Sequence, residues 1–126
     1  MPTPEETALG LMDDYLRALN DHDSEAMRAV FHFPHYRFAG GKVSVFERPE
    51  DLSFAEFARR TKADGWARSE WDERRVIHVD ADKVHLEVRF TRYRADGSAI
   101  GSYDSIWIAT TKNGRWGIRA RSSFAG

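Results

Sequence analysis

The fold is decided by residues 83–126, which read KVHLEVRFTRYRADGSAIGSYDSIWIATTKNGRWGIRARSSFAG. Apolar and polar side chains alternate in three runs within this stretch, and such alternation is typical of strands with one buried face. Two turns that end in Gly97 and Gly114 separate the runs. The pattern therefore predicts three antiparallel strands joined by tight hairpins.

The lengths of the two turns decide which side chains share a face of this sheet. Three-residue loops that end in a left-handed glycine would pair even-numbered residues with even-numbered ones. Val88 would then lie opposite Asp104, and Asp104 opposite Ser122, beneath the helices. Strict two-residue turns would shift the pairing by one residue and bring Tyr103 and Trp107 to the apolar side instead. We prefer the even register because it places apolar residues opposite apolar residues in all three strands.

Asp104 is the one acid on the apolar face of these predicted strands. A buried carboxylate must find a partner, or stay protonated because its charged form is poorly solvated. We therefore treat Asp104 as the strongest clue to chemistry in the chain. The alternative is an ordinary buried acid that is held by Arg92 or by a backbone group.

Composition excludes several classes of protein. The length of 126 residues predicts a single domain over residues 1–126. With 19 basic and 20 acidic residues, electrostatic capture of nucleic acid or of an anionic membrane is not expected. The absence of cysteine removes disulfides and thiolate metal sites. No segment has the length and apolar character of a signal or membrane span, so we expect a cytoplasmic protein.

Helix-start signals divide the part of the chain before these strands. A capping box begins a first helix at Thr3, and its apolar stripe continues to about Asn20. Asp23 is expected to cap a second helix that ends at Pro34, and Ser53 to cap a third.

Three further strands complete the predicted sheet. Two short ones, at about residues 36–39 and 42–46, are expected to be joined by a Gly-Gly turn. A long strand is expected from about Ser69 to Asp80.

This order of elements resembles the nuclear transport factor two-like, or SnoaL-like, superfamily over the whole chain. The resemblance is closest to the ketosteroid isomerase branch, through GLMDDY at residues 10–15, AVF at residues 29–31 and YDSIWI at residues 103–108. It implies a SnoaL-like domain of the α+β class. In such a domain three N-terminal helices pack on a curved mixed or antiparallel sheet and form a cone-shaped pocket.

The resemblance also implies roles for particular side chains. In the ketosteroid isomerase branch, a tyrosine and a protonated aspartate stabilise an enolate, and Tyr15 and Asp104 match those positions. The branch's general-base aspartate would fall near Ala39, where this sequence has no acid, so we take His35 as the base. The implied reaction is proton transfer beside a carbonyl, as in isomerases, cyclases and dehydratases.

Each of these roles has a structural alternative. Tyr15 could be a core tyrosine, and His35 could be a loop histidine bonded to the backbone. In that case the protein would be a non-catalytic ligand-binding or dimerisation module, with Asp104 held in an ion pair.

A small, largely apolar ligand is expected between the sheet and the first and third helices, with no metal and no cofactor. The predicted binding residues are Phe38, Phe54, Phe57, Trp66, Val88, Phe90, Arg92, Ile106 and Ser122. The odd-numbered face of the sheet is rich in Tyr, Trp and Arg, which are enriched at protein interfaces. A homodimer is therefore expected through this outer face, which carries Arg89, Tyr93, Tyr103, Trp107, Arg119 and Arg121.

Overall fold

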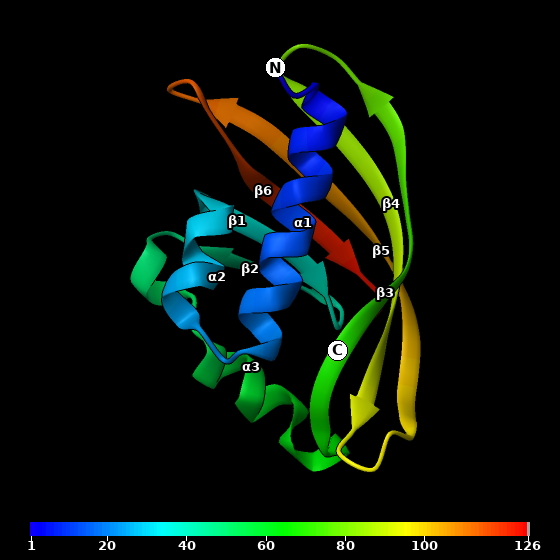
Figure 1. The fold of residues 1–126 in the computed structure, drawn as a ribbon. Coiled ribbons are helices and arrows are strands. Elements are labelled where there is room, and N and C mark those ends of the chain that lie inside the picture. The colour runs from blue at the N-terminus through cyan, green and yellow to red at the C-terminus, as the bar shows by residue number, and fades with distance from the viewer. Residues whose placement is uncertain (126) are drawn as a thin grey trace.

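A six-stranded sheet curves around the N-terminal helix (Figure 1). The structure is a computed structural model that describes residues 1–125, so Gly126, the last residue of the predicted domain, lies outside it. The helices are α1 (Pro4–Asn20), α2 (Ser24–Val30) and α3 (Phe54–Thr61), with short 3₁₀ turns η1 (Pro49–Asp51) and η2 (Lys62–Asp64) on either side of α3. The strands are β1 (Phe31–Ala39), β2 (Lys42–Phe46), β3 (Trp66–Val79), β4 (Lys83–Arg94), β5 (Ala99–Lys112) and β6 (Arg115–Ser123).

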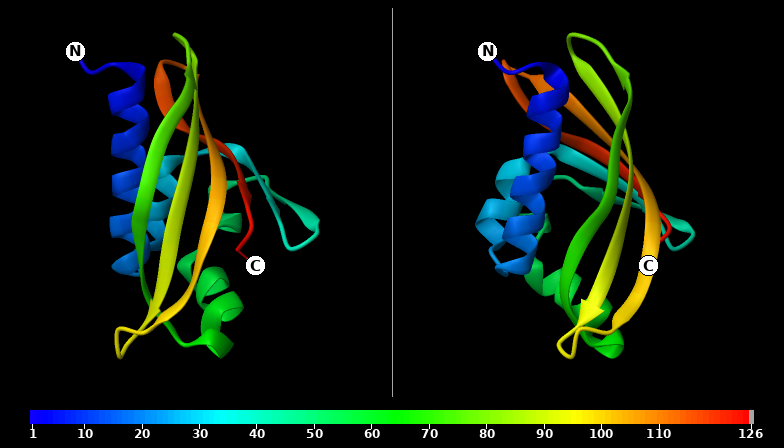
Figure 2. Two further views of the ribbon diagram at one scale, coloured as in Figure 1. Left: turned by 90° about the vertical axis from the view of Figure 1, so that its right-hand side faces the viewer. Right: turned by 45° about the vertical axis from the view of Figure 1, so that its right-hand side comes forward.

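The sheet is mixed, with the strand order β2-β1-β6-β5-β4-β3. Only the β1–β6 pair is parallel among the strand pairs of residues 1–125. The helices lie on one side of the sheet, and the convex side of β3, β4 and β5 faces away from them (Figure 2). The predicted α+β class with helices on a curved, mixed sheet is confirmed.

The helices begin where the capping signals place them. The Thr3 hydroxyl accepts a hydrogen bond from the Glu6 backbone N–H, and the Glu6 carboxylate accepts one from the Thr3 N–H, both over 3.1 Å. Asp23 caps α2, and Ser53 caps α3. The helix α2 ends at Val30, earlier than predicted, because Phe31 is fully buried and already pairs with Ile118 of β6.

The register of β5 differs from the predicted one by a single residue. Leu86 lies opposite Trp107, and Phe90 lies opposite Tyr103. The odd-numbered side chains of β5 therefore face the helices, and Trp107 is only 3% exposed. This is the arrangement that the rejected alternative register would give.

A β-bulge close to the β4–β5 turn causes this shift. The loop at residues 95–97 has the expected three residues, and Gly97 has a φ of +88°. Tyr93 pairs with Ala99, whereas Arg92 pairs with Gly101, so β5 carries one extra residue at this point. Every side chain beyond a bulge changes face.

The predicted burial of Asp104 is therefore wrong. Its side chain is 66% exposed on the outer face and accepts a hydrogen bond from Nη1 of Arg89 over 2.9 Å. Ile106 and Ser122 lie along the same outer groove. Three residues predicted for the outer dimer face lie on the inner face instead. Tyr103 packs beside Arg92, whose guanidinium lies 5.2 Å from the tyrosine ring centre, and Trp107 and Arg121 pair with each other.

No helix within residues 1–125 combines the length and the apolar character that crossing a membrane requires.

Candidate functional site

A cavity of about 40 Å³ lies between α1, α3 and the inner face of the sheet. This volume holds a few water molecules and is far below the roughly 300–1,000 Å³ of pockets for drug-sized ligands. Four arginines line the cavity together with aromatic side chains. The arginines are Arg37, Arg60, Arg92 and Arg121, and the aromatic residues are Tyr15, Phe57, Trp71, Phe90 and Trp107.

Arg37 reaches the cavity from β1 and is buried, with 8% of its surface exposed. Its Nη2 donates to the carbonyl of Ala125 over 3.1 Å. Burial, and then the charges of Arg60 and Arg121, lower the pKa of Arg37 to about 10. Arg37 therefore keeps its positive charge at neutral pH.

Arg121 enters the cavity from β6, directly opposite Trp107. Its Nε donates to Nε2 of His35 over 2.9 Å, and its Nη1 donates to the Tyr15 hydroxyl over 3.4 Å. The guanidinium carbon lies 4.9 Å from the Phe31 ring centre and 5.5 Å from that of Trp107, within the range of cation–π attraction. Burial lowers the pKa of Arg121.

His35 is fully buried beside Arg121, and its two ring nitrogens are both bonded within the protein. Because arginine can only donate, Nε2 of His35 is the acceptor, and Nδ1 carries the proton that it donates to the Ile118 carbonyl over 3.2 Å. Burial, and then the charge of Arg121, lower the pKa of His35 to about 2. His35 is thus a neutral ring that orients Arg121, and it does not line the cavity.

Arg92 and Arg60 close the cavity on the side of α3. Arg92 is 5% exposed, and its guanidinium lies 5.3 Å from the ring centre of Phe57. Burial, and then the charge of Arg60, lower the pKa of Arg92. Arg60 donates from Nε to the Glu56 carboxylate over 2.9 Å, so this charge is balanced at the rim.

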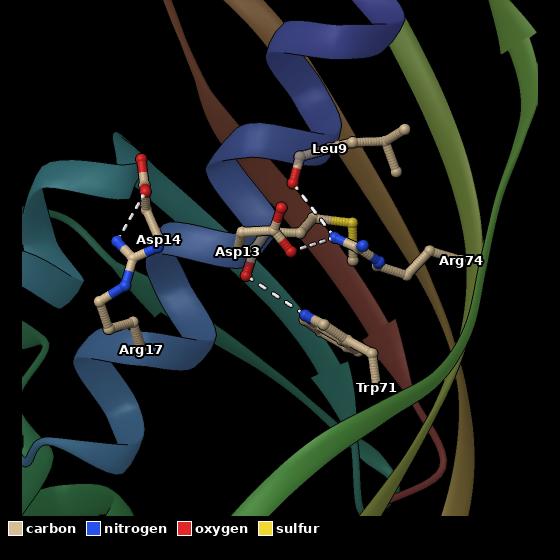
Figure 3. A network of polar contacts seen from close by, with 7 residues as sticks. Leu9, Asp13, Asp14, Arg17, Trp71 and Arg74 are labelled. Atoms are coloured by element: carbon tan, nitrogen blue, oxygen red, sulfur yellow. Dashed lines mark hydrogen bonds and ion pairs between the residues drawn. The ribbon is translucent and has the colours of Figure 1, made fainter.

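Contacts between β3 and α1 hold the cavity wall in place (Figure 3). Nε1 of Trp71 donates to the carbonyl of Met12 over 3.3 Å. Arg74 forms an ion pair with Asp13 and donates to the carbonyl of Leu9 over 3.3 Å. These bonds fix α1 against the sheet and hence fix the position of Tyr15, one turn further along.

The structure brings some of the predicted site residues together and separates others. Around the cavity lie Tyr15, Phe57, Phe90 and Arg92. Asp104 lies on the opposite face of the sheet, so it cannot share a ligand oxygen with Tyr15. Also away from the cavity lining are His35, Phe38, Phe54, Trp66, Val88, Ile106 and Ser122.

These separated residues have other surroundings. Phe38 is 46% exposed on the outer face. Phe54 and Trp66 pack on the far side of α3 with His22, where the His22 and Phe54 rings stack with centres 4.2 Å apart. Val88 belongs to the closed core and is 2% exposed.

The charged groups that dominate the cavity were not predicted from the sequence as site residues, apart from Arg92. The buried odd-numbered positions of β1 include Phe31, His35 and Arg37. This alternation is a signal that could have identified Arg37 as an inward-facing arginine. Arg121 could not be placed in this way, because the bulges of β5 and β6 decide which face it occupies.

No cluster of three or more His, Asp or Glu side chains within residues 1–125 could hold a metal ion.

Residues 5–123 match the model of a protein family described as NTF2-like protein (DUF6841). No curated protein is significantly similar to the chain. An NTF-2 like protein of unknown function from Shewanella oneidensis has a TM-score of 0.72 and 13% identity, with 97% of this chain and 99% of that chain covered. A protein of unknown function with a cystatin-like fold from Nostoc punctiforme has a TM-score of 0.71 and 16% identity, covering 97% and 92%. An NTF2-like protein from Cytophaga hutchinsonii has a TM-score of 0.70 and 13% identity, covering 99% and 100%. These similarities show a shared fold.

Proposed function

Because this chain belongs to the NTF2-like family DUF6841, whose fold alone does not specify an activity, we propose a function from its cavity. The protein binds a small organic anion, with the acidic group among the arginines and any apolar part against the aromatic walls. The sequence had predicted a largely apolar ligand, and the arginines change that expectation.

The observation that carries this proposal is the pair Arg37 and Arg121. Neither takes part in any ion pair formed within residues 1–125. Their hydrogen bonds go to uncharged acceptors, namely a backbone carbonyl, an imidazole and a hydroxyl. Charges taken out of water are costly unless they are paired. An anionic ligand would provide the missing pairing, and charge-assisted hydrogen bonds to arginine are strong and directional.

The second candidate is proton transfer beside a carbonyl, and one arrangement favours it. Tyr15 and Arg121 both present donors to the cavity, and together they could stabilise an oxyanion. A general base must lie within hydrogen-bond reach of the proton that it removes. The described residues that line the cavity include no carboxylate and no imidazole. The geometry therefore favours the binding role over the catalytic one.

Thermal unfolding in the presence of matched small molecules tests the binding role. Acetate should raise the melting temperature in a concentration-dependent manner, whereas acetamide, which has the same shape without the charge, should not. Arg121→Gln should abolish the acetate effect. Arg89→Gln, which removes one positive charge from the outer face, should keep it. Equal stabilisation by acetate and acetamide, or by acetate in both variants, would overturn the proposal.

A further inference from the structure

We infer that the ligand of the arginine cavity is a compact dianion, with one oxygen-borne negative charge for Arg37 and one for Arg121. This inference rests on the proposed function and adds the charge and the size of the ligand. Short dicarboxylates and phosphate-sized groups have this chemistry.

The charge of the ligand follows from the two arginines that have no acidic partner. Arg37 approaches from β1 and Arg121 from β6, so they reach the cavity from neighbouring strands. Each is bonded only to uncharged groups within the described chain. A single negative charge would leave one buried guanidinium uncompensated, and two negative charges would balance both.

The arginines also repel one another, which argues against a monoanion. The charges of Arg60, Arg121 and Arg92 all act to lower the pKa of Arg37. Glu56 forms its ion pair with Arg60 over 2.9 Å, and its charge offsets the field at Arg121 only from a distance, without an ion pair between them. Within the low-dielectric cavity this repulsion is poorly screened, so a second ligand charge contributes more there than at an exposed site.

The size of the ligand follows from the cavity and its walls. About 40 Å³ is available, which suits a group of a few heavy atoms rather than a steroid or a polyketide. The aromatic walls offer few alternative partners for charged oxygens. Tyr15 is one, because its hydroxyl accepts from Arg121 and keeps its own hydrogen for donation.

Neighbouring side chains keep the guanidinium of Arg121 in a fixed orientation. His35 takes the Nε hydrogen, which directs the two Nη groups toward Tyr15 and the cavity. Trp107 and Phe31 pack on the guanidinium. A pre-oriented donor loses little entropy when it binds an oxyanion.

Calorimetric titration with three matched probes tests the inference. Malonate carries two charges, monomethyl malonate carries one, and malonamide carries none. We expect malonate to bind at least tenfold more tightly than monomethyl malonate, and malonamide not to bind. Inorganic phosphate should compete with malonate. If phosphate binds and malonate does not, the ligand is restricted to phosphate-type dianions.

Variants connect the two charges to the two arginines. Arg37→Met should reduce malonate affinity at least tenfold and leave monomethyl malonate nearly unchanged, because one arginine still serves one charge. Arg89→Gln is the control and should bind malonate like the parent protein. Circular dichroism establishes that each variant is folded.

The failures of the two proposals are distinguishable. Equal affinity for malonate and monomethyl malonate, with no binding of malonamide, would overturn the dianion inference and leave anion binding intact. Equal binding of all three probes, or no binding of any anion by the folded protein, would overturn the proposed function as well.

Discussion

Arg121 and His35 form a hydrogen-bonded pair in which Nε of the arginine donates to Nε2 of the histidine over 2.9 Å. The pair needs a neutral imidazole, because a protonated ring would have no acceptor for Arg121. Burial and the charge of Arg121 lower the pKa of His35 to about 2 and keep the ring neutral. His35 is thus a positioning residue for the arginine that we propose as an anion ligand.

The neutral state of His35 predicts a dependence of stability on pH. The unfolded chain takes up a proton at His35 below a pH of about 6.5, whereas the folded chain does so only near 2. The free energy of unfolding should therefore fall as the pH falls from about 7 to 5, by up to about 1.4 kcal/mol per pH unit below 6.5. His35→Gln should show a shallower fall in urea unfolding. Burial also lowers the pKa of His32. His32 therefore contributes to the fall in the same direction in the parent protein and in His35→Gln.

The matched control for this measurement is the exposed His78. His78→Gln should retain the pH dependence of the parent protein. Parallel curves for the parent and for His35→Gln would mean that His35 is not held neutral by the fold.

Arg37→Met should weaken malonate binding without lowering the free energy of unfolding. It removes a buried charge that has no acidic partner within residues 1–125, and replacing buried ionic groups by apolar ones is often neutral or stabilising by about 1–4 kcal/mol. The variant also loses the hydrogen bond from Arg37 to the Ala125 carbonyl, which reduces this gain in stability by about 1 kcal/mol. The ligand-free variant should unfold at the same or a higher urea concentration than the parent. A loss of more than about 2 kcal/mol would show that the fold itself compensates this charge.

The register of β5 can be tested with one substitution on each face. Trp107 is 3% exposed, and its ring centre lies 5.1 Å from that of Tyr15, so Trp107→Ala should cost about 3–5 kcal/mol. The Asp104–Arg89 pair is exposed, so Asp104→Ala should change stability by less than about 1 kcal/mol. Chemical denaturation measures both, and a larger cost for Asp104→Ala than for Trp107→Ala would contradict the register.

We retain the homodimer as a proposal, with a revised surface. Phe38 lies opposite Val43, and Tyr36 lies opposite Val45, and all four side chains are exposed on one face of β1 and β2. Burial of this patch against a second copy would remove apolar surface from water. Light scattering should detect a dimer at micromolar concentration for the parent protein and a monomer for Phe38→Glu, and a monomeric parent would refute the proposal.

The sequence predicts the elements of this fold well because local signals specify them. The caps at Thr3, Asp23 and Ser53 begin the three helices as expected, and the inward positions of β4 follow the alternation that includes Leu86. Capping and alternation depend on neighbouring residues, so a single sequence contains them.

The faces of β5 and β6 could not be predicted, because β-bulges decide them. One extra residue near Gly101 reverses every side chain of β5 beyond it. The apolar pattern does not indicate the bulge, because Ile106 and Ile108 are as apolar as the inward residues Trp107 and Ala109. Arg121 was accordingly predicted on the outer face and Asp104 on the inner one, the reverse of what the structure shows.

The most direct test of the anion site is a crystal structure of the protein grown with malonate. We expect malonate density in the cavity, with one carboxylate within hydrogen-bond distance of Arg37 and the other bonded to Arg121 and the Tyr15 hydroxyl. A cavity that contains only water at a malonate concentration that stabilises the protein would contradict the account, because the stabilising anion would then bind elsewhere.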